Sequence, residues 1–221
     1  MGNQNCRIVG NLTFDRPLRD EHTKYLQRFF EIQHFQRDVD RLEQLADSLR
    51  LAAELPLGTQ GEYFLGEGSD SSINPCSSPA DSSQRHRDTI TRWDPPSDQP
   101  SNYCGWELTA DYTGLTSTGE TNKPDEYLKW LYYLIKSFFV RWEYALNGRV
   151  IIKSDNPLLV IVNNNMVQTL DLYQFMLNEL TEKDSRIGDL EAKVAMLENE
   201  VQFNPEGKGA MEAKKHFYSL A

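Results

Sequence analysis

Two carboxylates, Glu107 and Asp111, are four positions apart in the stretch CGWELTADYTGLTS. Paired acids of this kind could act as general acid and general base in a hydrolase. The same stretch predicts a strand, a turn at glycine and a second strand, and charged side chains on a hairpin are usually solvated. We therefore predict no catalytic residue and expect that the protein is not an enzyme.

Cys104 could be a nucleophile if a basic neighbour lowered its pKa, but no histidine lies close to it in the sequence. A small buried thiol is the expected role. The three cysteines and four histidines of the chain have no metal-ligand spacing. The sequence thus predicts no metal site, no cofactor and no disulfide framework.

Aromatic side chains gather between residues 93 and 142 and could form a stacking pocket for a base or a sugar. The alternative is that Trp130 and Trp142 pack the core while Trp106 closes it, because aromatic side chains dominate core burial. If this segment binds a ligand or a partner, we expect the contact to involve Trp93, Tyr103 and Trp106.

The chain has 221 residues and a formal net charge of -10, with no run of Lys and Arg. Such a surface repels nucleic acids and anionic lipid, so we expect no nucleic-acid partner and no membrane partner. No segment is long and apolar enough to cross a bilayer, and no secretory signal opens the sequence.

Hydrophobic periodicity and turn residues predict the elements of the first 170 residues. The predicted elements are a strand over 6–14, a helix from about Asp20, a helix from Val39 to Ala53, a short strand in 62–68, two strands within 104–117, a helix from Pro124 to about Trp142, a turn at Asn147-Gly148, and strands over 149–153, 158–162 and 166–170.

This order implies an α+β domain over residues 1–170, with a mostly antiparallel sheet and two or three packed helices. A Ser- and Pro-rich stretch over 66–101 predicts a surface insertion. Residues 171–202 predict a coiled-coil helix, and residues 203–221 a C-terminal tail.

A proline- and aromatic-rich segment carries a resemblance to a known domain. The matching residues are Pro95, Pro96, Gln99, Pro100, Cys104, Trp106, Trp130, Leu131, Tyr144, Leu146, Asn147 and Gly148. Their spacing resembles an uncharacterised domain family of bacteria and their phages, over roughly residues 7–170. Tyr103 stands where that family has Trp. The resemblance implies a fold and a bacterial or phage origin, and no mechanism.

Residues 171–202 repeat apolar side chains with the spacing of a coiled coil. Positions a of the heptad are Tyr173, Leu180, Ile187, Val194 and Val201, and positions d are Met176, Lys183, Leu190 and Leu197. Lys183 alone among these is polar. A pattern sustained over about four heptads predicts that several helices wrap together.

The charges beside the stripe favour a parallel arrangement. Arg186 and Lys193 occupy position g, and Glu191 and Glu198 occupy position e. In a parallel coil, Arg186 meets Glu191 and Lys193 meets Glu198 of the neighbouring helix, and both pairs attract. An antiparallel coil would bring like charges together.

The sequence constrains the number of copies less than it constrains the direction of the helices. Ile and Val at a with Leu at d favour two strands. Arg186-Ile187-x-x-Leu190-Glu191 resembles a short motif of parallel three-stranded coils, so we predict a homotrimer with a dimer as the alternative. A helix folded onto its own domain is a further alternative, although such a helix usually has a broader stripe.

These patterns favour a non-enzymatic structural or assembly protein, a phage virion component such as a fibre, tail or capsid-associated part. Its expected partners are copies of itself and other proteins of an assembly, and its expected location is the virion or the host cytoplasm. A ligand-binding module that sequesters a nucleotide-like ligand or blocks a host protein is the alternative, and an unrecognised hydrolase is a third.

Overall fold

The computed structural model of the protein describes residues 6–65, 94–121 and 124–203. Its elements in chain order are β1 (Cys6–Val9), β2 (Leu12–Phe14), α1 (Asp20–Glu31), α2 (Val39–Leu42), α3 (Ser48–Ala52), β3 (Trp106–Leu108), β4 (Gly114–Ser117), β5 (Glu120–Thr121), α4 (Pro124–Leu134), the π-helical segment η3 (Ile135–Phe139), β6 (Leu146–Lys153), β7 (Leu158–Asn163), β8 (Met166–Asp171) and α5 (Leu172–Phe203). The predicted α+β class is confirmed.

Eight strands in the described part of the chain form one sheet, in which the strand pairings are antiparallel. β6 lies at its centre, with β7 on one side and β1 and β2 in succession along the other. The sheet continues from β2 to β4 and β3, from β1 to β5, and from β7 to β8. The strand predicted over 6–14 is two strands, because Gly10 bends the chain at a φ of +108°.

The turn predicted at Asn147-Gly148 is wrong, since both residues lie inside β6. Gly148 has a φ of +134°, and a Cβ there would lie 2.9 Å from the Asn11 carbonyl oxygen and 3.2 Å from the Leu12 Cα. The glycine therefore allows β2 to approach β6 closely, and it does not reverse the direction of the chain.

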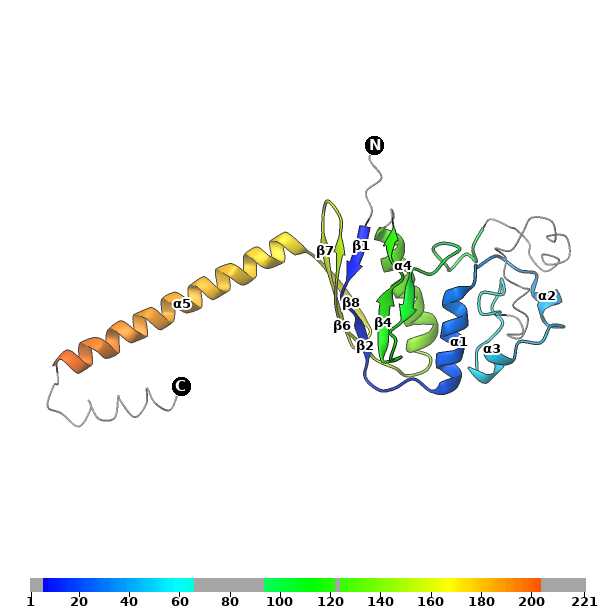
Figure 1. Ribbon diagram of the computed structural model, residues 1–221, viewed down its shortest axis with the longest axis horizontal. Coiled ribbons are helices and arrows are strands. Elements are labelled where there is room, and N and C mark those ends of the chain that lie inside the picture. The colour runs from blue at the N-terminus through cyan, green and yellow to red at the C-terminus, as the bar shows by residue number, and fades with distance from the viewer. Residues whose placement is uncertain (1–5, 66–93, 122–123, 204–221) are drawn as a thin grey trace. The chain divides into compact units, whose positions relative to one another are not determined.

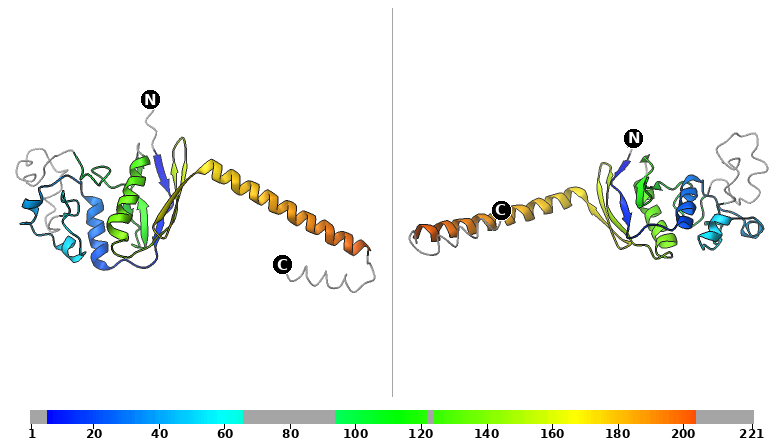
Figure 2. Two further views of the ribbon diagram at one scale, coloured as in Figure 1. Left: turned by 180° about the vertical axis from the view of Figure 1, so that it is seen from behind. Right: turned by 60° about the horizontal axis from the view of Figure 1, so that its bottom comes forward.

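α1 and α4 lie on one face of the sheet (Figure 1), and Figure 2 shows the same layering from behind. Both helices begin where the sequence predicted, each with two acidic residues in its first turn. The largest fully buried side chains include Leu12, Tyr25, Leu26, Phe29, Trp106, Leu115, Trp130, Leu131, Leu134, Phe138 and Phe139. The core thus lies between these helices and one face of the sheet.

The helix predicted from Pro124 to about Trp142 is present, but its second half widens into η3. Val140 N–H donates to the Ile135 carbonyl at 2.9 Å, a bond that spans five residues. The wider turn lets the neighbours Phe138 and Phe139 both enter the core. It also places Trp142 and Tyr144 beside α1, where they meet His22.

The single helix predicted from Val39 to Ala53 is wrong, because α2 ends at Leu42 and α3 starts at Ser48. The Asp47 carboxylate accepts a hydrogen bond from Arg50 N–H at 3.1 Å, so it caps a new helix. The strand predicted over 62–68 is absent from its described part, 62–65. There the Phe64 N–H donates to the Gly61 carbonyl at 3.0 Å and closes a turn.

The chain divides into two compact units, Met1–Leu172 and Tyr173–Ala221. The second unit is described as far as Phe203, the end of α5. The greater part of the Ser- and Pro-rich stretch, 66–93, and the tail 204–221 lie outside the described residues. Among the helices of the described ranges, none combines the length and apolarity needed to span a bilayer.

Candidate functional sites

The stripe on α5 is exposed to solvent in the single chain. Its members are 42–66% exposed: Tyr173, Met176, Leu180, Ile187, Leu190, Val194 and Leu197. The side chain of Val201 lies outside the described residues. With 3.6 residues per turn, positions three and four apart stack along one side of the helix, so these side chains form an apolar strip that Lys183 interrupts between Leu180 and Ile187.

Charged side chains border this strip. Arg186, Glu191, Lys193 and Glu198 are all exposed. None of them forms an ion pair with another residue of the described ranges. Their charges are therefore available to another helix.

The three aromatic residues predicted as ligand contacts do not form one described site. Tyr103 is 58% exposed, whereas Trp106 is 1% exposed. The Trp106 indole Nε1 donates to the Tyr127 carbonyl at 2.9 Å, and the two rings meet edge to face. Trp106 thus closes the core, as the alternative interpretation expected, and has no free face for a ligand. Trp93 lies outside the described residues.

Two candidates for catalysis, Cys104 and Asp111, have structural roles. The Cys104 thiol is buried, and burial raises its pKa, so the thiol stays protonated and is a poor nucleophile. The Asp111 carboxylate accepts hydrogen bonds from the hydroxyls of Thr109 (2.6 Å) and Thr113 (2.9 Å), which lower its pKa. It orders the turn between β3 and β4. Over the described ranges, no group of His, Cys, Asp and Glu side chains could hold a metal ion.

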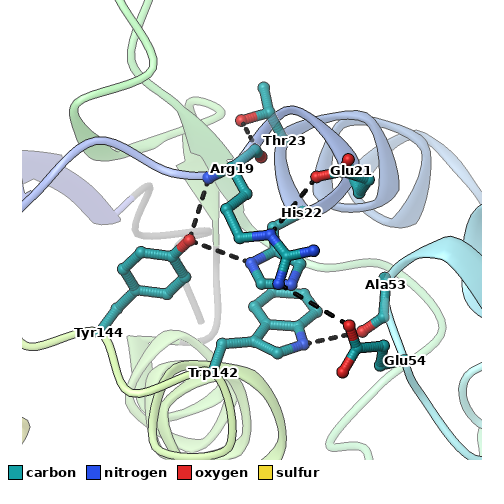
Figure 3. Close-up of polar contacts among 8 residues, drawn as sticks. All are labelled: Arg19, Glu21, His22, Thr23, Ala53, Glu54, Trp142 and Tyr144. Carbon is teal, nitrogen blue, oxygen red and sulfur yellow. Dashed lines mark hydrogen bonds and ion pairs between the residues drawn. The ribbon is translucent and has the colours of Figure 1, made fainter.

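A buried histidine forms a polar site that no sequence motif marked (Figure 3). The Tyr144 hydroxyl accepts a hydrogen bond from Arg19 N–H at 2.9 Å and lies 3.1 Å from His22 Nδ1. The hydroxyl thus links the start of α1 to the buried imidazole. The ring stacks on Trp142, with centroids 4.0 Å apart and planes 9° from parallel.

Arg19 reaches past His22 to two acids (Figure 3), at 3.5 Å from Glu21 and 3.8 Å from Glu54. Burial, followed by the positive charge of Arg19, lowers the pKa of His22 and keeps it neutral. A neutral imidazole bonded to a tyrosine could act as a base, but His22 is 3% exposed and has no approach for a substrate.

The same cluster ties distant segments together. The Trp142 indole Nε1 donates to the Ala53 carbonyl at 3.0 Å, at the end of α3. Tyr144 joins the start of α1 to the segment after η3. These bonds make the His22 cluster a structural junction of three helices.

Comparison with known proteins gives no match: no family model, no curated protein and no solved structure matches this chain.

Proposed function

We propose that the protein is a non-enzymatic subunit of a parallel homo-oligomer, held together by its α5 helices and serving as a structural or assembly component. The exposed apolar strip of α5 carries this proposal. Scattered apolar side chains on a surface are normal, but a row of seven along one side of a helix indicates a partner.

The gain from covering the strip is large compared with protein stability. Full burial of a side chain of this size contributes about 1.5–3 kcal/mol. Seven such side chains per helix, from Tyr173 to Leu197, are 42% exposed or more in the single chain. Helices in water owe most of their stability to packing of an apolar face, so α5 gains most from wrapping with its own copies.

The charges set the direction of the helices. Position e carries Leu177 in the first heptad and the acidic residues Asp184, Glu191 and Glu198 in the next three. An antiparallel coil would bring acidic e positions together, whereas a parallel coil pairs Glu191 with Arg186 and Glu198 with Lys193.

A polar layer sets the register. Glu179 at g would face Asp184 at e of the neighbouring helix, and these two charges repel. Lys183 at the intervening d position supplies the opposite charge for both. A charged residue at one core position lowers stability and disfavours shifted alignments.

Three copies are the proposed number, and two the alternative. Arg186 can reach across to Glu191 of the next helix while its aliphatic stem packs on the layer of Ile187 and Leu190. The further proposal of a phage virion component, such as a fibre, tail or capsid-associated part, is supported by the resemblance of residues 7–170 alone.

The mass of the protein in solution tests this proposal. The expected mass is three times 25.5 kDa, and a dimer would give twice that value. Leu190→Asp with Leu197→Asp should yield a folded monomer, because it places charges inside the strip. Met196→Asp is the matched control: Met196 is equally apolar and exposed on the same helix, but lies at position c outside the strip. A monomeric mass for the unmodified protein overturns the proposal.

A further inference from the structure

The sheet has a second apolar surface on the face opposite α1 and α4. Val150, Ile152, Val160 and Val162 alternate along β6 and β7 and belong to the core. Side chains alternate between the faces of a strand, so the residues between them point to the other face. Ile151 and Leu159 are two of these, and neither belongs to the core cluster, although Leu159 is itself buried.

Strand pairing aligns these residues into a row. Val9 pairs with Ile151, Ile151 with Leu159, and Leu159 with Leu170. Directly paired residues of antiparallel strands are close neighbours on one face. The row therefore crosses β1, β6, β7 and β8, and we name it the outer row.

The outer row is incompletely covered. Val9 is 40% exposed and Ile151 and Leu170 are partly exposed, whereas Leu159, which lies between Ile151 and Leu170, is only 5% exposed. The helices α1 and α4 of the globular unit lie on the opposite face (Figure 2). A row of four apolar side chains on the face away from α1 and α4 is unusual, because antiparallel sheets commonly carry polar residues on the face that is not packed on the core.

β8, the last strand that the outer row crosses, is followed directly in the chain by α5. Leu172 N–H donates to the Pro157 carbonyl at 3.0 Å, which extends the β7–β8 pairing by one step beyond Asp171. No linker separates β8 from α5, since β8 ends at Asp171 and α5 begins at Leu172.

The covalent chain limits the distance between Leu170 of the outer row and Tyr173, the first residue of the proposed coil. Tyr173 is the first a position of the coil, so it lies at the coil axis in the proposed assembly. Neighbouring helices in a coil are about 8–10 Å apart, and successive Cα atoms are about 3.8 Å apart. Leu170 therefore lies at most about 11 Å along the chain from a residue that touches another copy.

We infer that the outer row is a second contact between copies, in which the globular units of neighbouring chains meet at the base of the coil. This inference rests on the proposed oligomer. Its occupant is a second copy of the chain, because Leu170 is only three positions along the chain from Tyr173, the first residue of the proposed interface.

The test measures the dissociation constant of the oligomer by sedimentation over a dilution series. Leu170→Lys and Val9→Lys should each weaken association about tenfold or more. Thr169→Lys is the matched control, since Thr169 is exposed on the same strand and pairs with Val160 of the core face. The control should change the constant less than twofold.

A second measurement separates an interface from a damaged fold. In the monomeric background of Leu190→Asp with Leu197→Asp, Val9→Lys should shift the melting temperature no more than Thr169→Lys does. Val9 is already 40% exposed, so a charge there is tolerated by the isolated unit.

Failures of the two proposals are distinguishable. A monomeric unmodified protein overturns the proposed function and this inference together. If Val9→Lys and Leu170→Lys leave the dissociation constant of the oligomer unchanged, this inference alone is overturned. A larger shift for Val9→Lys than for Thr169→Lys in the monomer also overturns it, because the row then serves the fold of one chain.

Discussion

The Asp47 carboxylate accepts a hydrogen bond from the backbone N–H of Leu65 at 2.9 Å, across eighteen positions of the chain. The same carboxylate caps α3 through Arg50 N–H at 3.1 Å and lies 3.4 Å from the Arg50 guanidinium. Asp47 is buried, so one side chain holds the start of α3 and the segment that ends at Leu65.

Asp47→Ala should therefore lower the free energy of unfolding by about 3–5 kcal/mol, because it removes the cap and leaves Arg50 without its buried counter-charge. Asp40→Ala, at an exposed acid of the same region, should change it by less than about 0.5 kcal/mol. Chemical denaturation of both variants measures the difference. Equal effects of the two substitutions would contradict the role given to Asp47.

Stability should fall in acid because of a second buried histidine. His34 lies against Phe29 and Trp130, with ring centroids 4.3 Å and 5.4 Å away. Burial, with a smaller effect from the charge of Arg37, lowers the pKa of His34 from 6.5 to about 3. The unfolded chain thus binds a proton that the folded chain does not between about pH 6.5 and pH 3.

This difference in proton binding determines how the free energy of unfolding changes with pH. A histidine whose pKa is lowered by folding contributes its full stability above pH 6.5 and loses it as the pH falls. The free energy of unfolding should drop by up to about 1.4 kcal/mol per pH unit for His34. His34→Gln should make the slope between pH 6 and pH 4 shallower by about that amount. An unchanged slope in the variant would show that His34 is not the group responsible.

Two glycines should respond to alanine with opposite signs. Gly148→Ala should destabilise the globular unit by about 1–3 kcal/mol, because alanine is strained at a φ of +134° and its Cβ would press on the Asn11 carbonyl. Gly188 is helical and has no atom within 4 Å of an added Cβ. Gly188→Ala should therefore stabilise α5 by about 1 kcal/mol. Thermal melts of both variants give the signs, and a stabilising Gly148→Ala would refute the close approach of β2.

Charge reversal tests the direction of the helices. Arg186→Glu should weaken the oligomer by about 2 kcal/mol over three equivalent pairs, since attraction to Glu191 becomes repulsion. Adding Glu191→Arg should restore most of the loss, and 1 M salt should reduce both effects. Melting at a fixed protein concentration reports the change. A doubly reversed variant that stays as weak as the single one would exclude the parallel pairing.

Local chemistry was enough to predict much of the sheet and both long helices of the globular unit. Short apolar runs bounded by turn residues predicted β6, β7 and β8 over 149–153, 158–162 and 166–170. The asparagines between the last two strands form a turn, with Asn164 and Asn165 at positive φ. Acidic first turns located the starts of α1 and α4. These signals depend on near neighbours in the chain.

The errors arose where a distant residue determines the backbone. Leu42 and Leu49 have helical spacing, yet Asp47 between them bonds to Leu65 and starts a new helix. Asn147-Gly148 has the sequence of a turn, but the glycine accommodates β2 from the beginning of the chain. The His22 cluster joins Arg19, Tyr144 and Trp142, which are too far apart in sequence for any motif.

The position of Asn147 inside β6 also bears on how the protein ages. An asparagine followed by glycine loses ammonia when the next backbone nitrogen attacks its side-chain carbon. Here the Asn147 Oδ1 accepts a hydrogen bond from Asn164 N–H at 2.8 Å, and its Nδ2 donates to the Ala145 carbonyl at 3.4 Å. With the side chain held and the backbone fixed in a strand, deamidation is confined to moments when β6 opens. The amount of isoaspartate at position 147 would therefore report how often β6 has opened.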